Sequence, residues 1–164
     1  MPKSRKHPKP LRWLFLSAFV LVLDFVTKQV AVHFLTPYEP HAVFPGLNFM
    51  LAFNKGAAFS FLSNAGGWQQ WALGGIAIVV VIVLLIWLRK LPQEEKLASC
   101  GIALIIGGAL GNLCDRAVLH YVIDFIDVYY KQYHWPTFNI ADSAIVLGYC
   151  LLLSVSLMSV YGVG

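Results

Sequence analysis

The sequence predicts a membrane protein, mainly α, with four transmembrane helices and a small extracytoplasmic β-rich segment. Three observations lead to this fold class. First, 59% of the 164 residues are hydrophobic and the mean hydropathy is +0.70, whereas soluble globular proteins are far less apolar. Second, four apolar runs are each long enough to cross a hydrocarbon core of about 30 Å. Third, the basic residues gather in two places along the chain.

The apolar runs place the four spans at about residues 13–35, 68–88, 97–118 and 140–160. Asp24 and Lys28 interrupt the first span. The N-terminus resembles a signal peptide, because basic residues precede an apolar run. That run is too long for a signal peptide and has no convincing small-residue cleavage site, so we expect it to be retained. By its length, the chain 1–164 should form a single domain.

The basic residues predict the orientation of the chain. One group precedes the first span: Lys3, Arg5, Lys6, Lys9 and Arg12. The other lies between the second and third spans: Arg89, Lys90 and Lys96. Positive charge remains on the cytoplasmic side of a membrane, so both termini should be cytoplasmic and residues 36–67 and 119–139 external. The net charge of +4 follows from this topology and requires no nucleic-acid partner.

The two external segments are rich in aromatic residues. In the first, aromatic runs flank the sequence Asn54-Lys-Gly56, which predicts a small sheet or hairpin around this turn. The second carries a predicted aromatic belt for the membrane surface: Tyr121, Phe125, Tyr129, Tyr130, Tyr133 and Trp135.

Several chemistries are excluded by spacing. The five histidines include no His-Glu-x-x-His pair, which a zinc protease of that type requires. Glycine-rich nucleotide loops are also missing. A Ser–Lys dyad is disfavoured, because Lys55 lies in a turn that water should reach. Chemistry based on carboxylates remains.

The predicted topology brings six polar residues to the outer membrane face: Asp115, Arg116, Asp124, Asp127, Asn139 and Asp142. Asp24 follows Arg12 by about 18 Å of helix, which places it beyond the bilayer centre, toward the same face. Lys28 is one turn further and should pair with Asp24. A proton relay would spread such acids through the depth of the membrane, so the clustering favours hydrolysis at the surface. Interhelical pairs without catalysis are the other alternative.

Two carboxylates that face each other can share one proton and act as an acid–base pair. Asp142 is the only acid of the fourth span, and its partner could be Asp115, Asp124 or Asp127. Arg116 should hold Asp115 ionised, whereas the apolar neighbours of Asp124 would help it keep a proton. Asp127 is expected to be a loop carboxylate in water. The residues alone leave the choice open.

Five sequence blocks resemble the lipoprotein signal peptidases, or signal peptidase II, along nearly the whole chain. They are Asp24-Phe-Val-Thr-Lys28, Asn54-Lys-Gly-Ala-Ala-Phe-Ser60, Gly107-Gly-Ala-Leu-Gly-Asn112-Leu-Cys-Asp115-Arg116, Val122-Ile-Asp124-Phe125 and Phe138-Asn139-Ile-Ala-Asp142-Ser143. Their order and their placement on four spans also agree. One departure is Phe25, where the family often carries Gln.

The resemblance implies an aspartic endopeptidase of the bacterial inner membrane, with its active site toward the periplasm. Such enzymes cut prolipoproteins immediately before a diacylglyceryl-modified cysteine. The resemblance makes Asp124 and Asp142 catalytic and assigns supporting or substrate-binding roles to Asn54, Asn112, Arg116, Asn139, Asp24 and Lys28. It implies no metal or cofactor, contacts with membrane lipids, and inhibition by globomycin-type cyclic peptides. We expect a monomer in which residues 41–62 clamp the substrate.

Overall fold

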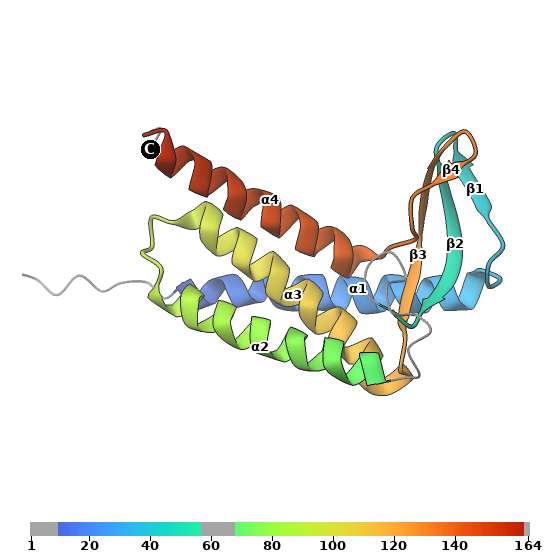
Figure 1. The fold of residues 1–164 in the computed structure, drawn as a ribbon, viewed down its shortest axis with the longest axis horizontal. Coiled ribbons are helices and arrows are strands. Elements are labelled where there is room, and N and C mark those ends of the chain that lie inside the picture. The colour runs from blue at the N-terminus through green and yellow to red at the C-terminus, as the bar shows by residue number, and fades with distance from the viewer. Residues whose placement is uncertain (1–9, 57–67, 163–164) are drawn as a thin grey trace, which may run out of the picture.

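Four long helices dominate the computed structural model, which describes residues 10–56 and 68–162 (Figure 1). A 3-10 helix, η1 (Pro10–Trp13), leads into α1 (Leu14–Phe34), and the others are α2 (Trp68–Lys90), α3 (Lys96–Leu119) and α4 (Ile140–Val160). Each is long and apolar enough to cross a membrane. The helix ends lie within two residues of the predicted spans.

α3 is the central helix, because it packs against α1, α2 and α4. Small residues make this possible. A Cβ atom at Gly108 would collide with the carbonyl oxygen of Ala141, and Gly101 and Gly148 lie directly against each other. The other helices expose many large apolar side chains, such as Phe19 and Val79, as expected for surfaces in contact with lipid.

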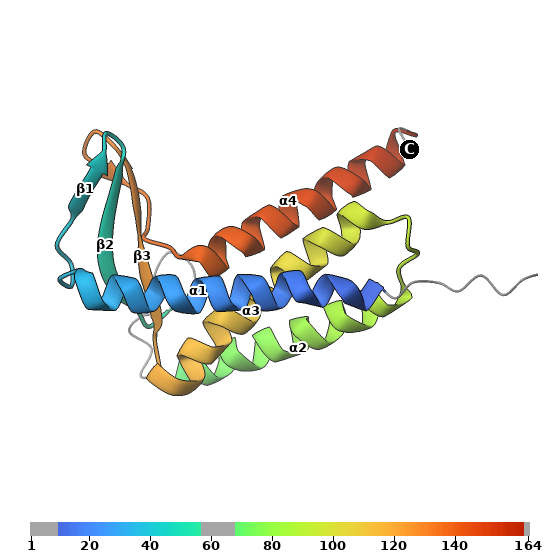
Figure 2. The same cartoon turned by 180° about the vertical axis from the view of Figure 1, so that it is seen from behind.

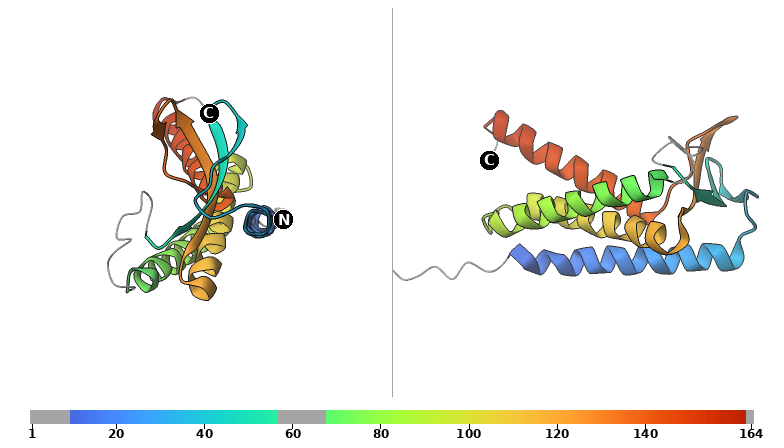
Figure 3. Two further views of the ribbon diagram at one scale, coloured as in Figure 1. Left: turned by 90° about the vertical axis from the view of Figure 1, so that its right-hand side faces the viewer. Right: turned by 60° about the horizontal axis from the view of Figure 1, so that its bottom comes forward.

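A four-stranded antiparallel sheet stands at one end of the helices, and the C-terminal end of α4 lies at the other (Figures 1 and 2). The strand order is β1 (His41–Phe44), β2 (Leu47–Asn54), β3 (Val122–Tyr130) and β4 (Tyr133–His134). The right view of Figure 3 shows the same separation of the sheet from the C-terminal end of α4. The predicted β-rich segment is therefore present, but it draws strands from both external segments.

The hairpin that the structure describes turns at another place than Asn54-Lys-Gly56; the second arm of the predicted hairpin, residues 57–62, lies outside the described residues. The turn between β1 and β2 lies at Pro45-Gly46, where Gly46 has φ +97, a conformation that glycine adopts without strain. Asn54 instead ends β2, and its side-chain oxygen accepts a hydrogen bond from the Gly56 backbone N–H at 2.9 Å. Asn-x-Gly and Pro-Gly are both turn signals, and the prediction did not assign the Pro45-Gly46 turn to a hairpin.

No strand was predicted for residues 122–130, which were interpreted as part of an aromatic belt. β3 pairs with β2, and Phe125 is buried in a cluster with Ala31, Leu51 and Ile123 rather than lying in an aromatic belt. The backbone N–H groups of Phe125 and Ile126 both donate to the carbonyl oxygen of Phe138, at 3.0 and 2.9 Å. These bonds hold β3 beside the start of α4.

Candidate active site

Asp124 and Asp142 come together where the sheet meets the helices. Asp124 is the third residue of β3 and lies opposite Ala52 of β2. Asp142 lies in the first turn of α4. Asp124 is 1% exposed, while Asp142 is only partly buried. The structure thus selects Asp124 as the neighbour of Asp142 from the three candidates.

Asn139 connects the two carboxylates. It is the N-cap residue of α4, and its Oδ1 accepts a hydrogen bond from the backbone N–H of Asp142 at 2.9 Å. Its Nδ2 donates to Oδ1 of Asp124 at 2.7 Å. Asn is favoured at N-caps because its side chain satisfies an unpaired N–H of the first turn. Here the same amide also fixes β3 against the helix.

Asn112, on α3, binds the other carboxylate. Its Nδ2 donates to Oδ1 of Asp142 at 2.7 Å. Its Oδ1 accepts from Asn139 Nδ2 and from Lys28 Nζ, each at 3.1 Å. Both ends of this buried amide are therefore in use, which fixes its orientation.

Asn54 and Arg116 complete the surroundings of the pair. Asn54 Nδ2 donates to Oδ2 of Asp124 at 3.1 Å. Arg116 donates to the carbonyl oxygens of Asn112 and Gly56, each at 3.3 Å, and its charge acts on both Asp124 and Asp142. Its buried Nε atom has no hydrogen-bond partner among the described residues.

Lys28 lies behind the pair and is 1% exposed. Its Nζ forms ion pairs with Oδ2 of Asp24 at 2.6 Å and with Oδ2 of Asp115 at 2.9 Å. The predicted Asp24–Lys28 pair is therefore present. Asp115, expected to be paired with Arg116, is paired with Lys28 instead. We call Lys28, Asp24 and Asp115 the Lys28 triad.

The expectation that Asp127 is a loop carboxylate in water was wrong. Asp127 is 0% exposed and accepts hydrogen bonds from Asn48 Nδ2 at 2.8 Å and from His134 Nδ1 at 2.8 Å. It lies three residues from Asp124 in β3, so the two side chains point to opposite faces of the strand. Asp127 is thus a part of the sheet rather than a partner of Asp142.

Burial and the charge of Asp142 raise the pKa of Asp124 from 3.8 to about 7. Hydrogen bonds from Asn54 and Asn139 lower it by smaller amounts. One carboxyl group that keeps its proton near neutral pH beside a second that can ionise is the arrangement that aspartic acid–base chemistry requires.

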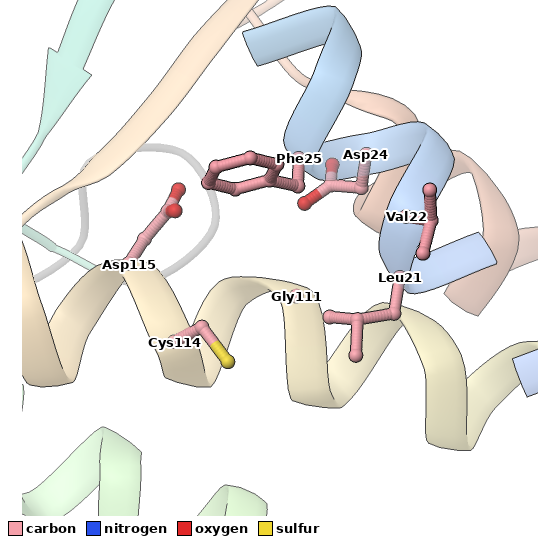
Figure 4. Close-up of a pocket in the computed structure, with 7 residues that line it drawn as sticks. All are labelled: Leu21, Val22, Asp24, Phe25, Gly111, Cys114 and Asp115. Atoms are coloured by element: carbon pink, nitrogen blue, oxygen red, sulfur yellow. The ribbon is translucent and has the colours of Figure 1, made fainter. Parts of the chain in front are cut away.

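A groove of about 350 Å³ opens between α1 and α3, beside the Lys28 triad (Figure 4). Asp24 and Asp115 line it together with apolar side chains, whereas Asp124 and Asp142 are not among its lining residues. Phe25 also lines the groove and is 61% exposed. The departure from the family pattern at Phe25 therefore lies on the outer surface, away from the two carboxylates.

All residues that the sequence assigned to the site belong to one connected network or touch it. Sequence reasoning considered Asp115 only as a possible partner of Asp142 and assigned it no supporting role, although the spacing Asn112–Asp115–Arg116 at the end of a span was the signal for one. It also missed Asn48 and His134, because the pairing of β3 with β2 and β4, which brings them to Asp127, was not predicted.

The comparisons with known proteins agree with this arrangement. A sequence model of the family described as Signal peptidase (SPase) II matches residues 16–158. The lipoprotein signal peptidase of Alteromonas mediterranea is 50% identical over 143 residues, which cover 87% of this chain and 79% of the relative. That of Coxiella burnetii (strain Dugway 5J108-111) is 46% identical over 156 residues, or 95% and 96% of the two chains.

A solved structure described as a bacterial membrane enzyme at 1.9 Å resolution has a TM-score of 0.80 and 31% sequence identity to this chain. The alignment covers 93% of this chain and 98% of the other. A second, described in the same words at 2.3 Å resolution, has a TM-score of 0.82, also at 31% identity, and covers 91% and 89%. Sequence and fold thus agree over nearly the full length, and the chain belongs to the signal peptidase II family of membrane aspartic peptidases.

Proposed function

We propose that this protein cleaves signal peptides from prolipoproteins immediately before the diacylglyceryl-modified cysteine, with Asp124 and Asp142 as the catalytic dyad. The main support is the pair itself: two carboxyl groups from different elements, tied to one asparagine, one of them with a pKa of about 7. The relatives named above are lipoprotein signal peptidases, which supports the substrate class.

The surroundings of the pair suggest which acid holds the proton at the start. Asp142 lies in the first turn of α4, where the helix dipole favours a negative charge. Asp124 is more deeply buried and keeps its proton up to a pH of about 7. In the proposed resting state Asp142 is therefore ionised and Asp124 is neutral.

The reaction then proceeds as general acid–base catalysis. Asp142 takes a proton from a water molecule, whose oxygen attacks the scissile carbonyl carbon. Asp124 gives its proton to the carbonyl oxygen, which yields a tetrahedral intermediate. As the C–N bond breaks, the proton held by Asp142 passes to the leaving amine, and Asp124 recovers its proton from the intermediate as the new carboxyl group forms. One water molecule is consumed and neither acid is changed.

Arg116 is proposed to orient the substrate backbone. Its Nε, which has no hydrogen-bond partner in the part of the chain that the structure describes, offers a donor beside the dyad. A preorganised cation also stabilises negative charge that develops in the transition state. Asn54, at the end of β2, donates to Asp124, and Gly56, two residues further, accepts from Arg116.

We propose that the site faces the periplasm from the bacterial inner membrane and that both termini are cytoplasmic. The basic residues Arg89, Lys90 and Lys96 lie at the ends of α2 and α3 that are remote from the sheet (Figure 1). That end should be cytoplasmic by the positive-inside rule. Globomycin-type peptides would compete with substrate at this site, and we propose that the protein acts as a monomer.

Residues 41–62, within the first segment predicted to be external, are proposed to clamp the substrate. Residues 57–62 lie outside the described part of the chain, but β1 and β2 expose Phe44 and Phe49, which suit an apolar substrate. Asparagine substitutions across residues 47–62 should raise KM or lower kcat. Unchanged affinity and rate throughout would contradict the clamp.

The dyad is tested with purified protein and a diacylglyceryl-modified precursor. Asp124→Asn and Asp142→Asn should each lower the cleavage rate by at least about 100-fold, because general acid–base catalysis contributes about 10²–10⁴. Asp127→Asn is the matched control, since it neutralises a buried carboxylate of the same strand on the opposite face. Cleavage that persists in both dyad variants would contradict the dyad. No cleavage by the parent protein would contradict the proposed activity itself.

A further inference from the structure

Each acid of the Lys28 triad accepts a hydrogen bond from the backbone next to one of the two proposed catalytic residues. Oδ1 of Asp24 accepts a hydrogen bond from the backbone N–H of Ala141 at 2.9 Å, and Ala141 directly precedes Asp142. Oδ2 of Asp115 accepts one from the backbone N–H of Ile123 at 3.1 Å, and Ile123 directly precedes Asp124. Each acid of the triad thus holds the residue before one member of the dyad.

Lys28 joins the two halves of this arrangement. Its Nζ contacts both acids of the triad and also donates to Oδ1 of Asn112 at 3.1 Å, whose amide group binds Asp142. The ammonium group is therefore linked to the backbone of both catalytic segments and to one catalytic side chain. Figure 4 shows the two acids of the triad on opposite helices, Asp24 on α1 and Asp115 on α3.

The surrounding structure is fitted to the triad. A Cβ atom at Gly111 would lie 2.6 Å from Oδ2 of Asp24, so glycine leaves the room that this carboxylate occupies. Asp24 and Lys28 are each 1% exposed. Buried charges are costly to desolvate, and replacing them by apolar residues is often neutral or stabilising. Fold stability alone is therefore a weak explanation for the triad, and its bonds to the catalytic segments suggest another.

We propose that the Lys28 triad sets the spacing of the two catalytic carboxyl groups, and that Asp115 is the positioning residue for Asp124. This inference rests on the proposed function, because it takes Asp124 and Asp142 as the dyad. Asp115 acts by fixing the backbone at Ile123 and by partly neutralising Lys28, whose charge reaches Asp124. Asp24 has the corresponding position relative to Asp142.

A change at Asp115 should alter both the rate and its pH dependence. Asp115→Asn keeps an acceptor for the Ile123 N–H but removes a negative charge beside Lys28. The charged groups around the dyad are Asp24 and Lys28 on α1, Asp115 and Arg116 on α3, and Asp142 on α4; β2 contributes the neutral amide of Asn54. Without the negative charge of Asp115, the positive charge of Lys28 acts more strongly on Asp124 and favours the ionised form of Asp124.

The expected result has three parts. In Asp115→Asn, the alkaline limb of the kcat profile should move to lower pH by roughly one unit. In Asp115→Ala, which also releases the backbone of Ile123, kcat should fall about 10- to 100-fold, since a displacement of about 1 Å costs about 10². KM should change little in both, because neither change removes a group placed against the substrate.

Asp127→Asn is again the control. Its loss of a buried carboxylate should lower the unfolding temperature but leave the pH limb in place. A folded Asp115→Asn enzyme with the parent's kcat and pH profile would overturn the inference. So would failure of this near-isosteric variant to fold, because the triad would then serve the fold rather than the dyad. Asp124→Asn and Asp142→Asn are measured in parallel. If they still cleave, the proposed function has failed; if only the Asp115 result fails, the dyad stands.

Discussion

At the scale of single residues, the partners of each carboxylate decide its role. Asp124, Asp115 and Asp127 are equivalent in a list of acids near the outer membrane face. In the fold, Asp127 is bound by Asn48 and His134, and Asp115 is paired with Lys28. Asp124 lies near Asp142, whose charge helps to raise the pKa of Asp124. These partners are 70 or more positions away in several cases, so no local pattern could have supplied them.

The raised pKa of Asp124 predicts how cleavage depends on pH. Below a pH of about 7, Asp124 holds the proton that the reaction requires, and above that pH Asp124 loses this proton. The value of kcat should therefore fall as the pH rises through about 7. The pKa in the folded state lies above the ordinary value of 3.8. This group's contribution to stability is therefore complete below pH 3.8 and is lost as the pH rises to about 7.

The same residue gives a direct spectroscopic test. Asp142→Asn removes the charge that helps to raise the pKa of Asp124, so Asp124 should lose its proton at a lower pH in this variant. The carboxylic C=O infrared band, taken as the difference between each protein and its Asp124→Asn derivative, would follow the titration. An Asp124 band that disappears at the same pH with and without Asp142 would show that the two groups do not interact.

At the scale of elements, the sheet owes part of its stability to one buried anion. Asp127 of β3 is bonded to Asn48 of β2 and to His134 of β4, so a single carboxylate ties three strands together. A buried carboxylate that loses a partner retains the cost of its desolvation. Asn48 is buried, but the His134 side chain is 50% exposed, so water can replace the histidine more readily than the asparagine.

Asn48→Ala should therefore destabilise the protein by about 1–3 kcal/mol, and His134→Ala by about 1 kcal/mol or less. Thermal unfolding of the purified variants in detergent measures both. The double variant Asn48→Ala/Asp127→Ala should be less destabilised than the sum of the two single changes, because it leaves no unpaired buried charge. Equal losses for Asn48→Ala with and without Asp127 would show that this bond contributes nothing.

At the scale of the whole molecule, the sequence was informative where the signal is local. Four apolar runs predicted four helices, because each must satisfy its own backbone in lipid. The hairpin turn at Pro45-Gly46 and the pairing of β2 with β3 were missed. Five of the first six residues of β3 are buried, and Ile126 is the exception, so the strand shows no alternation of buried and exposed side chains. Its partner strand also lies far away in the chain. One ion pair of the Lys28 triad, Asp24–Lys28, could be predicted from helical spacing. The other, Asp115–Lys28, could not, because it requires the packing of α1 against α3.

The arrangement of the ends predicts the topology of the whole chain in the membrane. The loop between α2 and α3 and the C-terminal end of α4 lie at the end of the bundle opposite the sheet (Figure 1). A cysteine placed at Glu94 should therefore be cytoplasmic, and one placed at Glu39, beside β1, periplasmic. Both glutamates are exposed, so either substitution should be tolerated by the fold.

Labelling with a membrane-impermeant thiol reagent tests this prediction. The native Cys100, Cys114 and Cys150, which form no disulfide, are first replaced by Ser or Ala, and cleavage activity confirms that this background is intact. Glu39→Cys should react in intact spheroplasts, whereas Glu94→Cys should react only in inverted membrane vesicles. The opposite pattern would place the dyad on the cytoplasmic side, where the signal peptide has not yet been translocated. It would contradict the proposed orientation. Because the sheet and the dyad share one end of the bundle, these two positions fix the side from which water and substrate reach Asp124 and Asp142.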